Sequence, residues 1–368
     1  MRKKICIFLS VIFCLITFAN GNYTSLLLGD SHGNIYYSEN IYEKHPIASV
    51  TKMMTVMVAY DRIRNEEIDL DDRVEISPKA RAVGGSMIWI SEGAKLTVRD
   101  LIKATSIYSA NNAAYALAEY IGMGDVDFFV KLMNQKAKEL GLENELEFYT
   151  PMGLPPSMTG KPMDRGTALG IYKLSLEALK YKEYITIASS KEDFIQDGAQ
   201  RILNRNKLIS EENGVYGIKT GHHSEAGYNI SIVAKRNDIT TITVVFGSPD
   251  AETRDRTVLT SLDKFYDEYQ LKKLIDLSKP MVKIDIKDGE KDVIYAYPNE
   301  EFEQLISKNW GVKIRRTYIK SIEAPVKSGE VLGSYQLIVN GKEIKDGRLY
   351  SRESVEKNKF IDKIRKIF

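Results

Sequence analysis

The stretch Ala48-Ser49-Val50-Thr51-Lys52 places a serine three positions before a lysine, at the start of the apolar residues 53–60. Pro46 lies just upstream, at a position where chains often enter a helix. Residues three apart share one helix face, so the lysine amine can meet the serine hydroxyl. Burial and the positive end of the helix dipole both lower a lysine pKa. The stretch therefore predicts a nucleophilic Ser49 that Lys52 activates without a histidine.

The spacing by itself is a weak signal, because Ser-x-x-Lys recurs at Ser261/Lys264 and Ser354/Lys357. What distinguishes the first copy is the run that follows it, which is apolar nearly all round and is typical of a helix in the middle of a domain. Ser49 is therefore the candidate nucleophile, and further support has to come from motifs downstream.

The composition is that of a globular protein. A length of 368 residues favours two domains, and a hydrophobic fraction of 43% is enough for a sizeable core. The formal net charge of +2 gives no argument for a nucleic-acid partner.

The N-terminus has the pattern of a secretory signal peptide over residues 1–21. Arg2, Lys3 and Lys4 precede an apolar run at residues 5–19, and small residues at 19–21 suit cleavage. The alternative is a retained membrane anchor, which needs about 20 apolar residues. Both cysteines of the chain lie inside this segment, so the exported protein is expected to fold without disulfides.

Helical and strand patterns alternate up to about residue 275. Strands are expected at 25–28, 35–37, 215–221, 228–234 and 240–246, with a hairpin turn at 30–33. Apolar helical spacing covers 101–118, 126–140, 167–179 and 257–269. These patterns predict an α/β domain over residues 22–275, in which helices pack on an antiparallel sheet.

The remaining chain changes character. Period-two alternation with hairpin turns predicts a small all-β domain at residues 280–350. Residues 354–368 then combine five large apolar side chains on one helical face with basic side chains on the rest. This pattern favours an amphipathic helix on an anionic membrane surface, and the alternative is a helix docked on the β domain.

Two further motifs follow Ser49 in the chain. Ser109-Ala110-Asn111 interrupts an apolar helical region; its serine can relay a proton and its asparagine can bind an amide, or Ser109 simply caps a helix over residues 112–120. Lys219-Thr220-Gly221 ends a predicted strand, where it offers charge and a hydroxyl to a carboxylate and lets a substrate backbone approach. For an isolated tripeptide, an ordinary strand end is the simpler interpretation.

Together and in this order, the three motifs resemble those of the serine-type penicillin-binding enzymes, Ser-x-x-Lys, Ser-x-Asn and Lys-Thr-Gly. Within that family the sequence is most similar to the low-molecular-mass D-alanyl-D-alanine carboxypeptidases. Landmarks of the resemblance cover nearly the whole expected mature chain, at residues 46–55, 85–93, 109–118, 152–154, 204–208, 217–229 and 324–333. The resemblance implies a penicillin-binding, serine β-lactamase-like transpeptidase domain followed by the family's β domain and membrane anchor.

The resemblance also implies a role for each site residue. Ser49 would be acylated, Lys52 would be its general base, and Ser109 would relay a proton to the leaving group. The backbone amides of Ser49 and His222 would form the oxyanion hole. The residues implied to bind substrate are Asn111, Lys219, Thr220, Gly221, His222 and Arg254, the last holding the terminal carboxylate.

The sequence departs from the family pattern at Ala110, Asn112 and His223, where glycine, aspartate and threonine are usual. The chemistry needs no metal and no cofactor. His222 and His223 are unlikely metal partners, because neighbouring residues on a strand point to opposite faces. His32 and His45 are expected in surface loops.

The predicted function is removal of the terminal D-alanine from peptidoglycan stem peptides ending in D-Ala-D-Ala, outside the cytoplasmic membrane, with β-lactams as covalent inhibitors. Three alternatives stay open. A class A β-lactamase needs a glutamate after the second motif, and residues 148–166 contain none. A D,D-endopeptidase is only weakly disfavoured by the β domain and anchor. A β-lactam sensor or inactive homologue is disfavoured by the absence of a second long apolar run and by the intact motifs.

Overall fold

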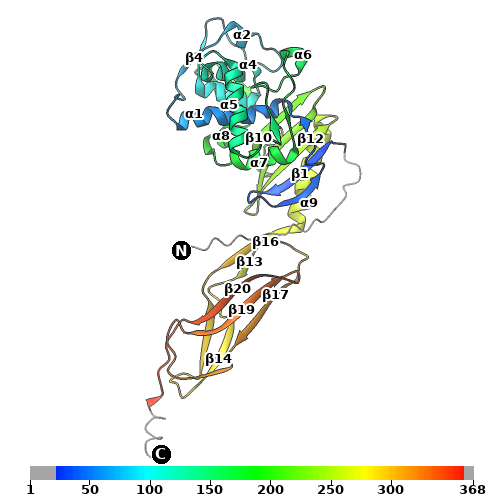
Figure 1. Cartoon of the computed structure of the whole chain (residues 1–368). Coiled ribbons are helices and arrows are strands. Elements are labelled where there is room, and N and C mark those ends of the chain that lie inside the picture. Colours follow the sequence, from blue (N-terminus) through cyan, green and yellow to red (C-terminus); the bar gives the residue numbers. More distant parts are fainter. Residues whose placement is uncertain (1–21, 360–368) are drawn as a thin grey trace, which may run out of the picture. The chain divides into compact units, whose positions relative to one another are not determined.

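The computed structural model describes residues 22–359 and divides the chain into two compact units, at Phe265/Tyr266. The first unit is built on an antiparallel sheet in the order β10-β11-β12-β1-β2 (Figure 1). Its strands are β1 (Ser25–Asp30), β2 (Ile35–Glu39), β10 (Val215–His223), β11 (Gly227–Arg236) and β12 (Ile239–Ser248). The early hairpin joins the late strands in one sheet, so the fold class predicted from the sequence is confirmed.

Helices and short hairpins surround this sheet, and α7 and α8 pack directly on its strands. The helices are α1 (Lys52–Arg64), α2 (Pro78–Arg81), α3 (Val98–Lys103), α4 (Asn111–Ile121), α5 (Val126–Glu139), α6 (Pro156–Thr159), α7 (Ala168–Ala178), α8 (Lys182–Ala188) and α9 (Ala251–Glu268). The short strands are β3 (His45–Pro46), β4 (Arg73–Glu75), β5 (Lys95–Thr97), β6 (Leu146–Glu147), β7 (Arg165–Gly166), β8 (Glu192–Ile195) and β9 (Gln200–Leu203).

Two of these elements differ from the sequence prediction. Helix α9 begins at Ala251 rather than at 257, because Asp250 accepts a hydrogen bond from the amide of Thr253 and caps a polar first turn that has no apolar period. The predicted helix at 101–118 is broken by a π-helical turn, Ala104–Tyr108, which places Ser109 outside both α3 and α4. In the sequence, Ser109, Asn111 and Asn112 interrupt the apolar spacing next to this break.

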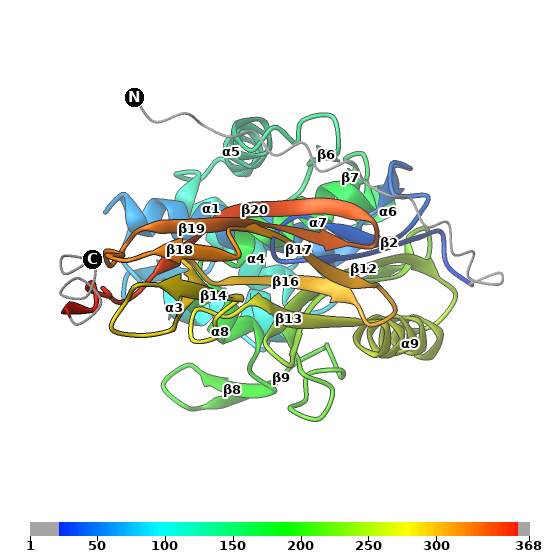
Figure 2. The same cartoon turned by 90° about the horizontal axis from the view of Figure 1, so that it is seen from below.

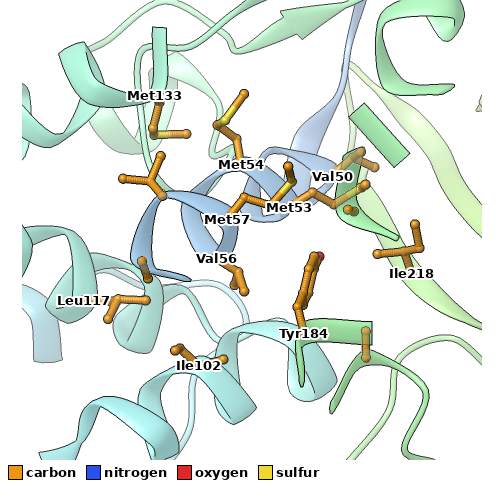
Figure 3. Packing of buried hydrophobic residues seen from close by; sticks show 14 of the residues in the cluster. Val50, Met53, Met54, Val56, Met57, Ile102, Leu117, Met133, Tyr184 and Ile218 are labelled. Carbon is orange, nitrogen blue, oxygen red and sulfur yellow. The ribbon is translucent and has the colours of Figure 1, made fainter. Parts of the chain in front are cut away.

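Helix α1 runs through the middle of the first unit. Every residue from Lys52 to Tyr60 is buried, as the all-round apolar pattern predicts. Figure 3 shows its methionines among side chains from α3, α4, α5, α8 and β10, namely Ile102, Leu117, Met133, Tyr184 and Ile218. Burial on all sides holds the beginning of this helix, and with it the Ser49 turn, at a defined place in the core.

The second unit is all-β, as predicted. A six-stranded sheet in the order β17-β19-β20-β15-β14-β18 accompanies the two-stranded sheet β13-β16 (Figure 2). Strand β14 shows the expected alternation, with Val282, Ile284 and Ile286 buried. The strands are β13 (Tyr269–Ile275), β14 (Val282–Lys287), β15 (Val293–Pro298), β16 (Phe302–Ser307), β17 (Val312–Tyr318), β18 (Ser321–Glu323), β19 (Val331–Val339) and β20 (Lys342–Ser351).

The second unit begins and ends at other residues than the sequence predicted. Residues 269–275 were assigned to the first domain, but they form β13 and pair with β16. A helix was expected from residue 354, but Val355 is 2% exposed and pairs with Val326 through the backbone, so residues 354–358 belong to the β unit. The predicted signal peptide at 1–21 and the helix residues 360–368 lie outside the described residues. Within residues 22–359, no helix is both long and apolar enough to cross a membrane.

Candidate active site

The Ser49 turn is a single 3-10 turn, Ala48–Thr51, that leads directly into α1. Ala48 has a φ of 48°, a left-handed conformation that is uncommon for a residue with a side chain. Ser49 is half-buried, whereas Lys52 is 0% exposed. The turn thus presents the serine at a surface while the lysine stays inside.

Lys52 brings the first two motifs together. Its Nζ lies 2.8 Å from Ser49 Oγ, 2.7 Å from Asn111 Oδ1 and 2.7 Å from the carbonyl oxygen of Met152. A neutral amine has two N–H groups and one lone pair. With the asparagine and Met152 oxygens accepting the two N–H groups, the lone pair faces the Ser49 hydroxyl. The geometry suits proton transfer from Ser49 to Lys52.

Burial and like charge favour this neutral form. Burial lowers the pKa of Lys52 well below its usual range, and the charge of Lys219 lowers it further, while Asp164 acts in the opposite direction. Burial also lowers the pKa of Lys219, to about 7, with added contributions from Arg205 and Arg254. Two lysines and two arginines in one region suit an anionic substrate and a lysine base.

The second motif is held by the loop at residues 84–88. Asn111 donates from Nδ2 to the Gly84 carbonyl (2.9 Å), and its own amide donates to the Ser86 carbonyl (2.6 Å). Asn112 accepts from the Ile88 amide (3.2 Å) and donates to the Ile88 carbonyl (2.8 Å). An amide side chain can do both, whereas an ionised aspartate only accepts. Asn112, a departure from the family pattern, thus fits its surroundings.

Ser109 is not the helix cap that one interpretation expected. The N-cap of α4 is Ala110, which makes no side-chain cap bond. Ser109 is 5% exposed with a φ of 64°, and its hydroxyl has no hydrogen bond to any residue in the range 22–359. Its hydroxyl is therefore available to a substrate or a proton relay.

The third motif lies on β10, an edge strand of the main sheet. Lys219 and Thr220 are buried, at 2% and 8% exposure. A Cβ atom on Gly221 would lie 2.6 Å from the Ile47 carbonyl and 3.1 Å from the Ser49 amide nitrogen. Glycine at this position therefore lets the Ser49 turn approach β10, a reason that the sequence prediction, which considered only the substrate, did not include.

The histidines differ in exposure and in contacts, with His32 and His222 exposed and His45 and His223 partly buried. His32 is exposed in the β1–β2 turn, but the prediction of a surface loop is wrong for His45, which lies on β3, stacks on Phe246 and places Nε2 2.7 Å from the Ala226 carbonyl. The His222 ring packs on Tyr228, with centroids 4.0 Å apart. His223 Nδ1 lies 3.1 Å from Glu225 Oε2. Among residues 22–359, no group of His, Cys, Asp and Glu side chains could hold a metal ion.

Arg254 projects from the first turns of α9 and is 5% exposed. Its Nε and Nη2 donate to Asp255 Oδ1 at 2.9 and 2.6 Å. Burial lowers the pKa of both Lys219 and His222, and the charge of Arg254 lowers both further, so Arg254 lies near the third motif. The structure therefore places Asn111 against Lys52 and Gly221 against the Ser49 turn, with Arg254 near Lys219.

Three groups of this region were not assigned a role from the sequence. The Met152 carbonyl is backbone and carries no side-chain signal. Asp164 lies in a Pro-, Gly- and Met-rich loop, yet it is 2% exposed and bonded to the Ser49 turn. Arg205 stacks on Tyr108, 4.2 Å from the ring centroid, beside Ser109. Met152 and Arg205 fell in stretches that the resemblance had marked, whereas Asp164 did not.

Comparison with known proteins matches a family model to each unit. Residues 22–250 match the family model described as D-alanyl-D-alanine carboxypeptidase, and residues 269–357 match the C-terminal domain of penicillin-binding protein 5. The D-alanyl-D-alanine carboxypeptidase DacF of Bacillus subtilis is 30% identical over 347 residues, covering 92% of this chain and 87% of that relative.

The chain is also similar to solved structures of penicillin-binding proteins. Penicillin-binding protein 5 from Haemophilus influenzae has a TM-score of 0.67 and 27% identity, covering 93% of this chain and 100% of that chain. Penicillin-binding protein D2 from Listeria monocytogenes, solved in an ampicillin-bound form, has a TM-score of 0.56 and 25% identity, covering 66% of this chain and 97% of that chain.

The fold and the Ser-Lys site thus define a serine hydrolase of the penicillin-binding class. Within that class the chain belongs to the D-alanyl-D-alanine carboxypeptidase family, and it is a serine-type D-Ala-D-Ala carboxypeptidase. The endopeptidase and sensor alternatives are not favoured, since relatives that match over nearly the whole chain carry the carboxypeptidase name.

Proposed function

We propose that Ser49 is the nucleophile of this carboxypeptidase and Lys52 its general base. The 2.8 Å contact between Lys52 Nζ and Ser49 Oγ carries the proposal. Ser49 Oγ attacks the carbonyl carbon of the penultimate D-alanine while its proton passes to Lys52. The peptide bond then breaks, and the proton passes through Ser109 to the amine of the departing D-alanine. Water hydrolyses the resulting ester and restores the Ser49 hydroxyl.

Substrate binding is assigned to the walls around Ser49. The backbone amides of Ser49 and His222 would hold the oxyanion, because Gly221 brings β10 close to the turn. Asn111 would bind the stem-peptide amide, and Lys219, Thr220 and Gly221 would line the peptide. Arg254 would bind the terminal carboxylate with Lys219 and Thr220. β-Lactams, one of which is bound in the Listeria relative, would acylate the same serine.

The test is Ser49→Ala in the mature chain. Wild type should release D-alanine from a pentapeptide ending in D-Ala-D-Ala and should bind one fluorescent penicillin covalently, whereas Ser49→Ala should do neither. Ser261→Ala is a matched control, since Ser261 also precedes a lysine by three residues but is buried in α9 and donates to the Thr257 carbonyl. Covalent labelling of Ser49→Ala at full stoichiometry would exclude Ser49 as the nucleophile.

We further propose that the protein is exported and attaches to the outer face of the cytoplasmic membrane through its C-terminal sequence. Residues 359–368 contain four lysine or arginine residues together with Phe360, Ile361, Ile364, Ile367 and Phe368. Each basic residue near an anionic surface contributes roughly 1 kcal/mol, to which apolar burial adds. Together these contributions suit reversible peripheral attachment.

The attachment is tested by truncation after Asn358, which keeps the buried Val355 and its bridge to Val326. Vesicles containing anionic lipid should sediment the mature protein but not the truncated one, and high salt should weaken binding. A full-length variant with Lys363, Arg365 and Lys366 changed to Gln is the control for charge. If mature protein and truncation sediment equally, the attachment proposal is wrong.

A further inference from the structure

The backbone of Asp164 is hydrogen-bonded to the chain that leads into the Ser49 turn. It immediately precedes β7, which pairs antiparallel with β3, so that Arg165 is opposite Pro46. The Asp164 carbonyl oxygen accepts from the amide of Ile47 at 3.1 Å. The chain just before Ser49 is therefore fixed by the chain around Asp164.

The side chain of Asp164 contacts the other side of the same turn. Its Oδ2 accepts from Thr51 Oγ1 (3.2 Å) and from Thr150 Oγ1 (2.6 Å). Its Oδ1 accepts from the backbone amides of Tyr149 and Thr150, the latter at 2.9 Å. Four donors point at one carboxylate that is 2% exposed. A buried carboxylate with four donors is built into the fold, because leaving those donors unpaired would cost stability.

Thr150 connects Asp164 to the peptide group that binds Lys52. Its Oγ1 accepts from the Gly153 amide at 2.9 Å, and the preceding carbonyl, that of Met152, accepts from Lys52 at 2.7 Å. Gly153 has a φ of 78°, and a Cβ on it would lie 1.9 Å from the Ala48 carbonyl oxygen. The segment at residues 150–153 is therefore pressed against the Ser49 turn, with its geometry determined at Asp164.

We propose that Asp164 is a positioning residue of the acylation reaction, which locks the Ser49 turn to the Met152 carbonyl and supplies a buried negative charge to the Ser49–Lys52 pair. This inference rests on the proposed role of Lys52 as general base. Asp164 touches neither Ser49 nor Lys52 through a side-chain hydrogen bond in the structure; it acts through Thr51, Thr150 and Met152.

Electrostatics give the proposal a second consequence. The charged groups that affect Lys52 are Lys219 from β10, which lowers its pKa, and Asp164, which raises it. Arg205 and Arg254 act on Lys219 in turn. Burial raises the pKa of Asp164 to about 6, against its hydrogen bonds, so the carboxylate is ionised at neutral pH. Removing its charge should therefore lower the pKa of Lys52 further.

Two variants separate geometry from charge. Asp164→Asn keeps an acceptor for the two backbone amides and turns its NH₂ toward hydroxyls that can rotate to accept, but it has no charge. Thr150→Val keeps the charge and removes the hydroxyl that links Asp164 to Gly153. Asp61→Asn is the matched control, because Asp61 is the carboxylate partner of a different lysine, Lys136. For each mature protein, the rate constant for acylation by a fluorescent penicillin is measured from pH 5 to 10, together with the melting temperature.

In Asp164→Asn, the acid limb of the rate profile should move to lower pH relative to its own plateau, because Lys52 loses its proton more easily. Thr150→Val should lower the plateau about tenfold to a hundredfold, as expected for a misplaced contact in a reacting pair, with the acid limb unmoved. Asp61→Asn should lower the melting temperature and leave both the plateau and the limb unchanged. A purely structural Asp164 would change the melting temperature alone.

The proposal is overturned if Asp164→Asn and Thr150→Val keep the wild-type plateau and acid limb. If Asp164→Asn does not fold, Thr150→Val alone decides, and an unchanged plateau there refutes the positioning role. Mass spectrometry of labelled wild type distinguishes failure of the Asp164 proposal from failure of the proposed function of Ser49. Label on Ser49 with unchanged profiles in the variants refutes only Asp164, whereas label elsewhere refutes the assignment of the nucleophile.

Discussion

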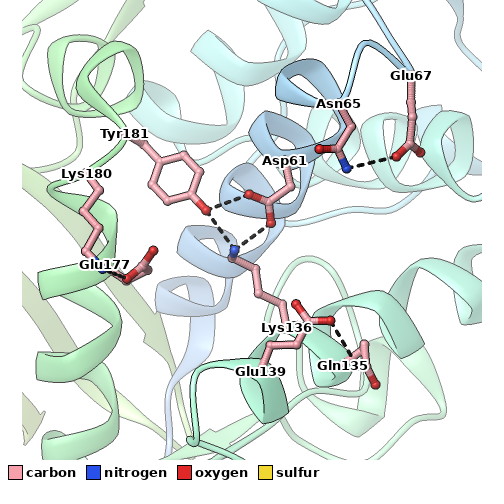
Figure 4. Close-up of polar contacts among 9 residues, drawn as sticks. All are labelled: Asp61, Asn65, Glu67, Gln135, Lys136, Glu139, Glu177, Lys180 and Tyr181. Atoms are coloured by element: carbon pink, nitrogen blue, oxygen red, sulfur yellow. Dashed lines mark hydrogen bonds and ion pairs between the residues drawn. The ribbon is translucent and has the colours of Figure 1, made fainter.

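Two buried lysines near opposite ends of helix α1 have opposite surroundings. Lys136 of α5 lies 2.6 Å from Asp61 Oδ2 and 2.8 Å from the hydroxyl of Tyr181, which itself donates to Asp61 at 2.6 Å (Figure 4). Burial lowers the pKa of Lys136, but the bonds to Asp61 and Tyr181 outweigh burial and raise it above its usual value. This lysine is a cation at neutral pH that ties α1 to α5 and to the start of α8.

Lys52, at the beginning of α1, has only neutral oxygens in contact, from Ser49, Asn111 and Met152. The charge next in influence is the cation Lys219, and the carboxylate of Asp164 acts without a direct bond. The comparison shows what makes a buried lysine a base rather than a structural cation: a carboxylate in contact keeps the proton on, whereas neutral acceptors and a like charge let it leave.

The largest expected effect comes from Lys52→Arg, which keeps the charge but cannot give up its proton. Acylation by penicillin should fall roughly 10²–10⁴-fold, the usual range for loss of a general base. The variant should still fold, so that the loss appears in the acylation rate constant and only a small change appears in the melting temperature. Stopped-flow or gel-based labelling measures the rate, and near-normal acylation in the arginine variant would contradict the base assignment.

Arg254→Ala tests a cation that is paired yet faces the site. Its bond to Asp255 leaves other guanidinium N–H groups for a carboxylate. Loss of a charge-assisted bond of about 1.5–3 kcal/mol predicts roughly a 10- to 150-fold fall in kcat/KM on peptides with a free C-terminus. Neutral thioesters should lose much less. Arg256→Ala, an exposed neighbour on α9, is the control; equal losses on both substrate types would make Arg254 structural.

Lys136→Met should reverse the pattern of Lys52→Arg. The free energy of unfolding should fall by about 1–3 kcal/mol, since Asp61 loses its partner but its side chain is 33% exposed and can be hydrated. Acylation per folded molecule should stay at the wild-type rate. Urea titration and penicillin labelling measure the two quantities, and the double variant with Asp61→Asn should recover part of the loss.

The last prediction concerns how the stability of the protein depends on pH. The pKa of Lys219 is about 7 in the folded protein and 10.5 when unfolded, so unfolding takes up a proton in that window. The stability that Lys219 contributes should therefore rise as pH goes from 7 to 10.5. Relative to Lys219→Met, wild type should gain melting temperature between pH 7 and 10. Lys136 has the opposite effect on stability. Its pKa is raised in the folded protein, so the stability that it contributes is lost as the pH rises above 10.5. Parallel curves for wild type and Lys219→Met would mean that Lys219 stays charged.

Much of this protein was predictable from local patterns. The apolar run after Ser49 predicted a central helix, alternation predicted β14, and the hairpin at residues 30–33 predicted the β1–β2 pair. The three motifs, through their resemblance to the penicillin-binding enzymes, predicted a candidate site, and in the structure Asn111 contacts Lys52 while Gly221 lies against the Ser49 turn.

Other features depended on contacts between segments far apart in the chain. Residues 269–275 became a β strand through pairing with β16, and Val355 was kept in the β unit by Val326, although the sequence there suggested a helix. His45 became a packed residue through Ala226 and Phe246. Such pairing is invisible to a pattern because it depends on the partner strand.

The protonation of the lysines was decided in the same way. By sequence, Lys52, Lys136 and Lys219 are alike, each next to apolar residues. Tertiary structure gave Lys136 a carboxylate, Lys52 the carbonyl of Met152 and Lys219 two arginines nearby. Residue types and their spacing determined which chemistry the chain can perform, whereas only the fold decided which lysine holds its proton, because a pKa is set by burial and by neighbours that the chain brings from a hundred residues away.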